Sequence, residues 1–258
     1  MSSEYLFNIQ TVQSGAFRVL VEALKDILTD CNFIVDKTGI KLIATDNSHN
    51  VLIHMKLKAE NFDYYECKEK ITIGVNMTNM YKLIKTMSNN ETLTLFIDKL
   101  YPNQLGIQMN NNDKNTKTTY KLNLLDIDDE DINIPPASFE TELTLPSSDF
   151  QKLVRDMTNI GEHVEVKSVG STLMFNCNGD FASQETTLGE TQNGLQFSQS
   201  SAPETPIQGI FSLKYLLLFT KCTNMCNQIH MYIKNDYPLV IKYAVANLGD
   251  IKLCLAPN

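Results

Sequence analysis

The strongest constraint on this sequence is an internal repeat. The segment FRVLVEAL from Phe17 aligns with FQKLVRDM from Phe150, and VNMTNMYKLIK from Val75 aligns with FSLKYLLLFTK from Phe211. The two pairs occur in the same order and are separated by nearly the same length of chain. Two matches could arise by chance among amphipathic helices, but matching order and nearly matching spacing favour duplication. We therefore expect two similar domains.

Hydrophobic periodicity predicts an α+β fold in which each half carries two helices and mostly antiparallel strands. Apolar residues recur at helical spacing in four segments, at about 14–29, 76–88, 147–160 and 212–221. Serines are the expected caps of three of them: Ser14, Ser147 or Ser148, and Ser212. The Asn-rich segment 110–115 is typical of a hairpin tip. Strands are predicted around residues 51–57, 93–97, 120–124, 140–145, 172–177, 228–234 and 238–255.

The segment LLDIDDEDINIPP, residues 124–136, separates the two halves. Its acidic core should repel itself and stay extended, while Ile132, Ile134 and Pro135 offer apolar points of contact. A plain solvated linker is one interpretation, but the alternating apolar residues favour a connector that also packs or binds something. We expect an N-terminal domain at 1–123, a connector at 124–139 and a C-terminal domain at 140–258.

Several sequence features bear on where such a chain works. No run of about 18 apolar residues is present, so no membrane contact is expected. The first ten residues lack the basic start and apolar run of a secretory signal. Six scattered cysteines read as reduced, mostly buried thiols. We expect a location inside a cell or a viral replication compartment.

The charge is unevenly distributed along the chain. A net charge of −8 argues against a protein that simply adheres to nucleic acid. The four helical segments nevertheless hold eight basic and four acidic residues, while the rest holds 14 basic and 26 acidic ones. Any single lysine on a helix face is most simply a solvated residue. If the four faces line one surface, however, that surface attracts phosphates without reading bases, and the binding is salt-sensitive.

An enzyme is the competing class of function. Cys222, Cys226 and His230 have a spacing that resembles metal ligands, but a fourth ligand and the short CxxC pairing are missing. The simpler interpretation is that these residues lie where a helix ends and the chain continues through a turn into a strand. The sequence has no glycine-rich phosphate loop, nucleophile elbow or HExxH motif. We therefore predict no catalytic residue, no metal and no cofactor.

Together, several segments resemble the proliferating cell nuclear antigen family, the eukaryotic-type DNA sliding clamps, over nearly the whole chain. Each segment alone would be weak, but the set is highly specific. The segments are VEALKDIL near Val21, TDNSHNVL near Thr45, GVNMTNMYKLIK from Gly74, YKLNLLDIDDEDINIP from Tyr120, LPSSDFQKLVRDMTNIG from Leu145, SLKYLLLFTKCT from Ser212, YPLVIKY from Tyr237 and the terminal LAP at 255–257.

The resemblance implies a DNA-clamp fold and a homotrimeric ring with pseudo-six-fold symmetry around duplex DNA. Helices would line the hole, acidic sheets would face outward, and edge strands near 116–122 and 178–188 would pair between subunits. The ring would act in the nucleus as a processivity factor for replicative DNA polymerase and serve repair proteins. A clamp-like factor acting as a monomer, dimer or hetero-ring subunit is the alternative. The implied DNA-facing residues are Arg18, Lys25, Lys82, Lys85, Lys152, Arg155, Lys214 and Lys221.

The resemblance also implies protein partners. An ATP-driven clamp loader would place the ring on DNA, and partners would carry a peptide with a Gln plug and an apolar, partly aromatic helical turn. For His49, a role in the peptide pocket and a role as a turn histidine bonded to backbone are equally plausible. The implied pocket for the peptide consists of Thr45, His49, Leu52, Ile132, Ile134, Pro135, Pro238, Cys254, Ala256 and Pro257.

Departures from the family pattern bear on specificity and regulation. Cys254 replaces an aromatic residue of the pocket floor and Thr45 replaces a larger apolar one, so partner preference should differ. Gly170 stands where many relatives have a modifiable lysine, which puts regulation by ubiquitin at that position in doubt. Asn159 takes the place of a histidine of the inner wall. These differences favour a virus-encoded or otherwise divergent member.

Overall fold

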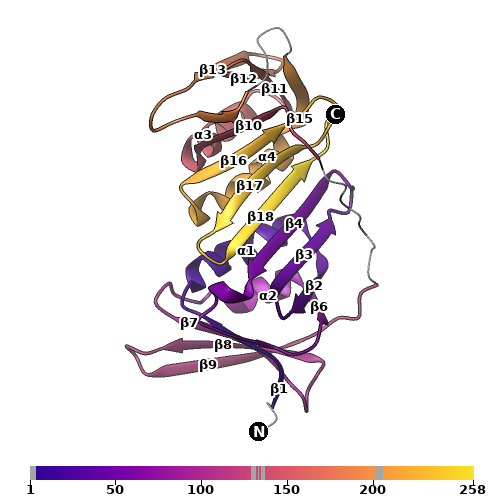
Figure 1. Ribbon diagram of the computed structural model, residues 1–258, viewed down its shortest axis with the longest axis vertical. Coiled ribbons are helices and arrows are strands. Elements are labelled where there is room, and N and C mark those ends of the chain that lie inside the picture. Colours follow the sequence, from indigo (N-terminus) through magenta and orange to yellow (C-terminus); the bar gives the residue numbers. More distant parts are fainter. Residues whose placement is uncertain (1–3, 129–131, 133, 135–136, 201–205) are drawn as a thin grey trace. The chain divides into compact units, whose positions relative to one another are not determined.

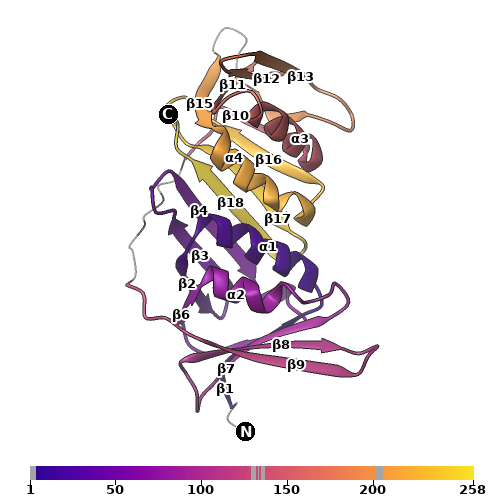
Figure 2. The ribbon, with the colours of Figure 1, turned by 180° about the vertical axis from the view of Figure 1, so that it is seen from behind.

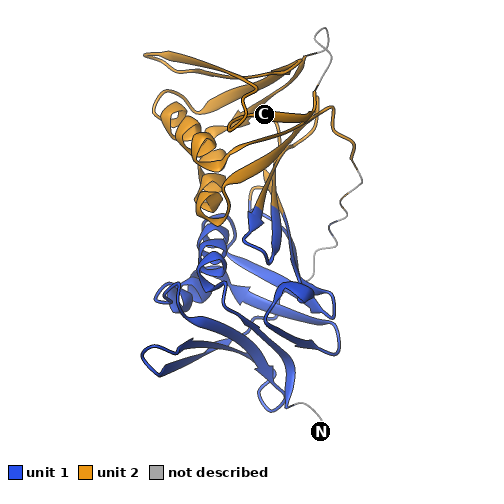
Figure 3. Ribbon diagram, turned by 60° about the vertical axis from the view of Figure 1, so that its left-hand side comes forward, with its two compact units in different colours: residues 1–47, 54–132, 244–251 blue, residues 48–53, 133–243, 252–258 orange. Residues whose placement is uncertain are grey.

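The computed structural model describes residues 4–128, 132, 134, 137–200 and 206–258. The chain divides into two compact units (Figure 3). Unit 1 comprises residues 1–47, 54–132 and 244–251, and unit 2 comprises residues 48–53, 133–243 and 252–258. Each unit therefore takes most of one half of the sequence and a short part of the other.

The two halves of the chain have the same order of strands and α-helices (Figure 1). The first half runs β1 (Tyr5–Thr11), α1 (Ser14–Ile27), β2 (Asp30–Asp36), β3 (Gly39–Thr45), β4 (Val51–Lys58), β5 (Tyr64–Cys67), β6 (Ile71–Asn76), α2 (Met77–Ile84), β7 (Thr92–Asp98), β8 (Gln104–Asn111) and β9 (Thr116–Asn123). The second runs β10 (Thr141–Pro146), α3 (Ser147–Thr158), β11 (His163–Val169), β12 (Thr172–Asn178), β13 (Ser183–Gly189), β14 (Gln196–Gln199), β15 (Ile207–Ser212), α4 (Leu213–Phe219), β16 (Gln228–Ile233), β17 (Leu239–Val245) and β18 (Gly249–Leu255).

Strand pairing repeats as well, which confirms the duplication. One sheet has the order β5-β1-β7-β8-β9, and its counterpart in the second half is β14-β10-β16-β17-β18. The order β6-β2-β3-β4 is likewise matched by β15-β11-β12-β13. The strands pair in antiparallel fashion, as in β1 with β7 and β12 with β13. The predicted α+β fold of two similar domains is therefore correct.

In unit 1, α1 and α2 pack side by side on one face of the sheet that contains β4, β3, β2 and β6 (Figure 2). Leu20 and Leu24 of α1 lie with Met55 and Leu57 of β4 around one small apolar cavity of about 30 Å³. The alternation predicted for 51–57 is confirmed, because the side chains at alternate positions are fully buried, namely Val51, Ile53, Met55 and Leu57, while Lys56 between them is exposed. Hydrophobic burial of this face fixes which side of the strand is outward.

In unit 2, α3 and α4 pack against each other in the same manner (Figure 2). The buried face of α3 is formed by Phe150, Leu153, Val154 and Met157. The predicted helix at 147–160 ends at Thr158, and the one at 212–221 ends at Phe219. Beyond that point the chain tightens into the 3₁₀ helix η2 (Thr220–Met225), which carries Lys221.

The predicted serine caps of α1 and α3 are wrong, because Ser14, Ser147 and Ser148 lie inside the helices, whereas the predicted position of Ser212 is correct. Ser14 lies inside α1 and its hydroxyl donates to the Ser88 carbonyl at 3.3 Å. Ser147 likewise donates to the carbonyl of Cys226 at 2.6 Å. Ser212 occupies the N-cap position of α4, yet makes no capping hydrogen bond through its side chain. A side-chain cap is instead provided at α2 by Asn76, whose Oδ1 accepts from the amide of Asn79 at 2.9 Å.

Two further findings concern the whole chain. No helix among the described residues has the length and apolar character needed to cross a membrane. The cysteines are thiols, and Cys31, Cys67, Cys177 and Cys222 are buried. Burial raises the pKa of Cys31 to about 12, so this thiol is a poor nucleophile at neutral pH.

Candidate functional sites on helix faces, strand edges and the connector

The helices of unit 1 carry four of the basic residues implied to face DNA. Lys82 on α2 and Lys85 at its C-terminal cap are exposed. The guanidinium group of Arg18, by contrast, is hydrogen-bonded within unit 1. Its Nη1 donates to the Met87 carbonyl at 2.6 Å and its Nη2 donates to Asn89 Oδ1 at 3.1 Å. Lys25 forms an ion pair with Asp26 at 2.7 Å and lies over the ring of Tyr81. Among the helices of unit 1, the accessible positive charge therefore lies mainly on α2.

The helices of unit 2 carry the other four. Lys152 and Arg155 on α3, Lys214 on α4 and Lys221 on η2 are all exposed. They stand opposite the apolar faces that bury Phe150 in α3 and Leu216 in α4. Each is thus on the outward side of its helix, where its ammonium or guanidinium group is accessible to an anion.

Lysines gather on the face of the unit 1 sheet that is turned away from the helices. Lys56 and Lys58 are exposed on the side of β4 that faces away from the helices. Together with Lys37 from the β2–β3 turn they line a shallow depression, in which the one acidic residue is Glu60. The acidic excess of the chain therefore resides elsewhere, in part in the connector that begins with Asp126 and Asp128.

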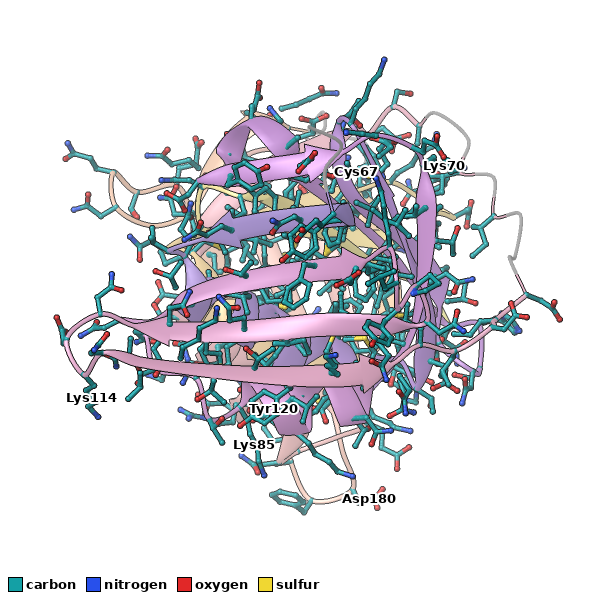
Figure 4. All side chains as sticks on the ribbon, turned by 90° about the horizontal axis from the view of Figure 1, so that it is seen from below. Cys67, Lys70, Lys85, Lys114, Tyr120 and Asp180 are labelled. Carbon is teal, nitrogen blue, oxygen red and sulfur yellow. The ribbon has the colours of Figure 1, made fainter. Side chains whose placement is uncertain are left out.

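Two long strands stand at the ends of their sheets. β9 has eight residues and β13 has seven, and in the part of the chain that the structure describes each has a neighbour on one side only. Figure 4 shows Lys114 at the tip of the β8–β9 hairpin and Tyr120 on β9. The expected edges near 116–122 and 178–188 are thus present as sheet edges. Such an edge offers unpaired backbone N–H and C=O groups to another strand.

A pocket of about 470 Å³ lies in unit 1 beneath the connector. Thr45 and Ile132, two residues of the implied partner-peptide pocket, both line it. Three further isoleucines, Ile34, Ile43 and Ile127, contribute to its wall, and sequence reasoning missed them. A signal was present, because Ile34 and Ile43 occupy outward positions of β2 and β3, where alternation predicts polar side chains. The rim is polar: Asp30, Asn32, Asn47, Lys70 and Asp128.

The first residues of the connector are held on β6 and β2. The Leu125 amide donates to the Gly74 carbonyl at 2.8 Å, which makes an isolated antiparallel bridge beyond the edge strand β6. Further along the connector, the Ile127 carbonyl accepts from Asn32 Nδ2 at 3.0 Å. These contacts close one side of the pocket.

The other implied pocket residues belong to unit 2. The amide of Ala256 donates to the Asn50 carbonyl at 2.9 Å, which brings the C-terminal segment beside the β3–β4 turn. His49 in that turn is exposed and has a φ of 56°, a left-handed conformation typical of turn residues. Burial raises the pKa of Cys254 to about 11. Leu52, Ile134 and Pro238 are half-buried and Pro257 is exposed, whereas Pro135 lies outside the described residues.

The spacing of Cys222, Cys226 and His230 does not correspond to a metal site. In the described part of the chain no three His, Cys, Asp or Glu side chains are grouped so as to hold a metal ion. Cys222 is buried in η2, Cys226 donates to the Gln228 carbonyl at 3.1 Å, and His230 is exposed on β16. The structure instead has a helix end, a turn and a strand here, as the simpler interpretation of the sequence predicted.

Comparison with known proteins gives the family. The model of the proliferating cell nuclear antigen N-terminal domain matches residues 6–131, and that of the C-terminal domain matches residues 133–258. The chain belongs to the proliferating cell nuclear antigen family. The chain is 34% identical to a probable DNA polymerase sliding clamp of Paramecium bursaria Chlorella virus 1, over 98% of this chain and 97% of the relative. It is 32% identical to the proliferating cell nuclear antigen of Chaetomium thermophilum, over 95% of each chain.

Family membership fixes the class of function. Members are DNA sliding clamps, which act as polymerase processivity factors and are not enzymes, so this chain is a clamp and not a catalyst. The two-domain α+β architecture is the DNA-clamp fold. One of the relatives described above is viral and the other is from a eukaryote, which fits a role at nuclear or viral replication sites.

Proposed function

We propose that this protein is a homotrimeric sliding clamp that encircles duplex DNA and tethers a replicative DNA polymerase and other replication and repair proteins. It would work in the nucleus, or in a viral replication compartment if a virus encodes it. An ATP-driven clamp loader would open and close the ring on DNA, and ring closure would supply retention, so that weak phosphate contacts suffice.

The proposal rests on a strand pairing. One pair of strands is hydrogen-bonded within the described ranges of the chain, while the equivalent pair of the repeat is not. β18 and β4 are hydrogen-bonded neighbours. In the duplicated order, β9 is the counterpart of β18 and β13 is the counterpart of β4. β9 and β13 have no such neighbour among the described residues. We infer that β9 of one copy pairs with β13 of the next, as their counterparts β18 and β4 pair within one chain.

The other sheet ends do not compete for this role. β5 and β14 have only four residues each, which is a short edge. β6 is covered at Gly74 by the connector, and the Ile210 carbonyl of β15 accepts from the Asn258 amide at 2.9 Å. β9 and β13 are therefore the long exposed edges of the described chain.

Charge on the two edges is complementary. Lys117 and Lys121 are exposed on β9, while Glu185 is exposed on β13 and Asp180 lies in the turn before it. A contact between two different surfaces of one molecule is heterologous, and it closes into a ring when the rotation between copies allows it. Three copies of two repeats would give the six-fold pseudosymmetry of the family.

The helices supply the proposed DNA contacts. The exposed cations of α2, α3, α4 and η2 would lie along the hole and contact phosphates without reading bases. Arg18 and Lys25 would contribute less, since each is already engaged within unit 1. The eight proposed residues are Arg18, Lys25, Lys82, Lys85, Lys152, Arg155, Lys214 and Lys221.

Partner proteins would bind along the connector. The proposed peptide pocket keeps the positions that the resemblance implies, and two of these, Thr45 and Ile132, line the observed cavity of unit 1. Apolar walls with a few polar groups are typical of such sites. Cys254 and Thr45 make this pocket different in shape from one with larger side chains at both positions, so the preferred peptide should differ.

Mass and polymerase stimulation together test the proposal. A homotrimer should have a mass of about three times 29.2 kDa in solution, and it should raise the length of product per polymerase binding event on primed circular DNA. A trimer that stimulates synthesis on circular DNA, but not on linear DNA with open ends, supports encirclement. A monomer or dimer that stimulates equally on both templates would instead support the alternative, a clamp-like factor that does not form a homotrimeric ring.

A further inference from the structure

We propose that Asn32 and Gly74 are positioning residues that clamp the connector, and that they thereby set the wall of the partner pocket. The inference rests on the proposed peptide pocket. The two residues face each other across β2 and β6, and each holds one point of the connector. Asn32 Nδ2 binds the Ile127 carbonyl at 3.0 Å, and the Gly74 carbonyl binds the Leu125 amide at 2.8 Å.

The duplication indicates that the backbone part of the clamp belongs to the fold. Asn258 follows β18 as Leu125 follows β9, and its amide donates to the Ile210 carbonyl of β15. Leu125 and Asn258 are offset along the chain as Phe17 and Phe150 are, and Gly74 and Ile210 are offset as Val75 and Phe211 are. In both repeats, then, the segment leaving the last strand is bonded to the equivalent carbonyl of an edge strand.

The two repeats differ, however, in the residue types at two positions of the clamp. Gly74 corresponds to Ile210, and Asn32 corresponds to Glu165, which faces Ile210 across β11 and β15. A Cβ atom at position 74 would lie 2.2 Å from the Leu125 carbonyl oxygen, closer than any side chain tolerates. The absence of a side chain lets the connector lie directly on β6.

The amide of Asn32 then fixes the connector where the pocket begins. Asn32 and Ile127 line the same cavity, together with Ile132 farther along the connector. The hydrogen bond from the Asn32 side chain to the Ile127 carbonyl joins residues 95 positions apart in the sequence. It therefore restrains the connector wall of the pocket through a long-range contact. The position of Ile127 and Ile132 against β2 and β3 therefore depends on residues that need not touch the partner.

Hydrogen exchange measured on the full-length protein tests the clamp directly. In Asn32→Ala, and in the isosteric Asn32→Asp, the amides of 125–128 should exchange roughly threefold to tenfold faster, the effect of one lost hydrogen bond. Gly74→Ala should give at least the same increase. Asn61→Ala is the matched control, since Asn61 Nδ2 also donates to a backbone carbonyl, that of Leu248 at 3.4 Å, away from the connector.

Peptide affinity tests the consequence. A fluorescein-labelled peptide with the Gln and aromatic helical-turn motif should bind Asn32→Ala and Gly74→Ala with a dissociation constant roughly threefold to tenfold higher, and Asn61→Ala as wild type. Unchanged exchange in both clamp variants overturns the proposal, as does faster exchange with unchanged peptide affinity. If the wild-type protein does not bind the peptide, the proposed pocket fails, while faster exchange still supports the clamp on the connector.

Discussion

Asp36 shows how one carboxylate organises a turn in this protein. It ends β2, and its Oδ1 accepts from the Thr38 amide at 2.7 Å and from the Thr38 hydroxyl at 2.5 Å, while Oδ2 binds Lys41 Nζ at 3.0 Å. The Thr38 hydroxyl, followed by Lys41, holds the pKa of Asp36 well below its usual range. The turn closes at Gly39, whose φ of 142° and contact with the Leu57 carbonyl exclude a side chain.

Replacing Asp36 with Asn should cost about 1 kcal/mol of unfolding free energy at pH 7, the net value of a hydrogen bond weakened by loss of charge. The folded-state pKa is depressed, so the ionised carboxylate stabilises the protein above the unfolded pKa of about 4 and this stabilisation is lost as pH falls toward the folded value. Urea titrations should therefore show the wild-type advantage shrinking between pH 5 and about pH 3. A constant difference across that range would contradict a role for the charge.

At the scale of elements, the β12–β13 hairpin is fixed against the end of α3 by close backbone contact. A Cβ on Gly179 would lie 1.7 Å from the Ile160 carbonyl oxygen, and one on Gly161 would lie 2.7 Å from the Asn178 carbonyl oxygen. The Cys177 thiol also faces the Met157 carbonyl, at 3.6 Å. Because the hairpin leads into β13, this contact holds the proposed intersubunit edge on unit 2.

Gly179→Ala should lower the free energy of unfolding by about 2 kcal/mol, since a methyl group is forced against backbone that cannot move aside cheaply. Gly189→Ala at the far end of β13 makes the same chemical change where no atom lies within 4 Å of the added carbon, and it should cost little. Denaturant unfolding of both variants measures the difference. Equal stability of the two would show that the hairpin can shift away from α3 freely.

At the scale of the whole molecule, function depends on where charge lies and not on its sum. The chain carries −8, yet exposed cations stand on the outward faces of α2, α3 and α4. A second set, with Lys37 and Lys56, stands on the opposite side of the sheet in unit 1. Only the helix set should contact DNA if the proposed ring is correct.

Charge reversal separates these two sets. Arg155→Glu combined with Lys221→Glu should weaken DNA binding by tenfold to a hundredfold, on the order expected for two phosphate contacts, and should lower polymerase stimulation while the trimer mass is unchanged. The matched variant, Lys37→Glu with Lys56→Glu, changes the net charge equally and should retain DNA binding. Equal losses in both variants would mean that net charge, and not the helix faces, controls binding.

The duplication, the four helices and the buried face of strands such as β4 could be predicted from the amino-acid sequence, because helical and strand periodicity depend on neighbouring residues. The sequence also indicated the basic helix faces and the connector. Its local signals failed at helix caps, where Ser14 and Ser147 bond to distant carbonyls instead.

Three features could be learned only from the folded chain: which strands are left as edges, the hydrogen bond from Arg18 to Met87, and the one from Asn32 to Ile127. These contacts join residues 69 and 95 positions apart, so they depend on the order of strands in the sheets. No local propensity encodes that order. It is set by which hydrophobic faces and backbone edges can be satisfied together in one fold.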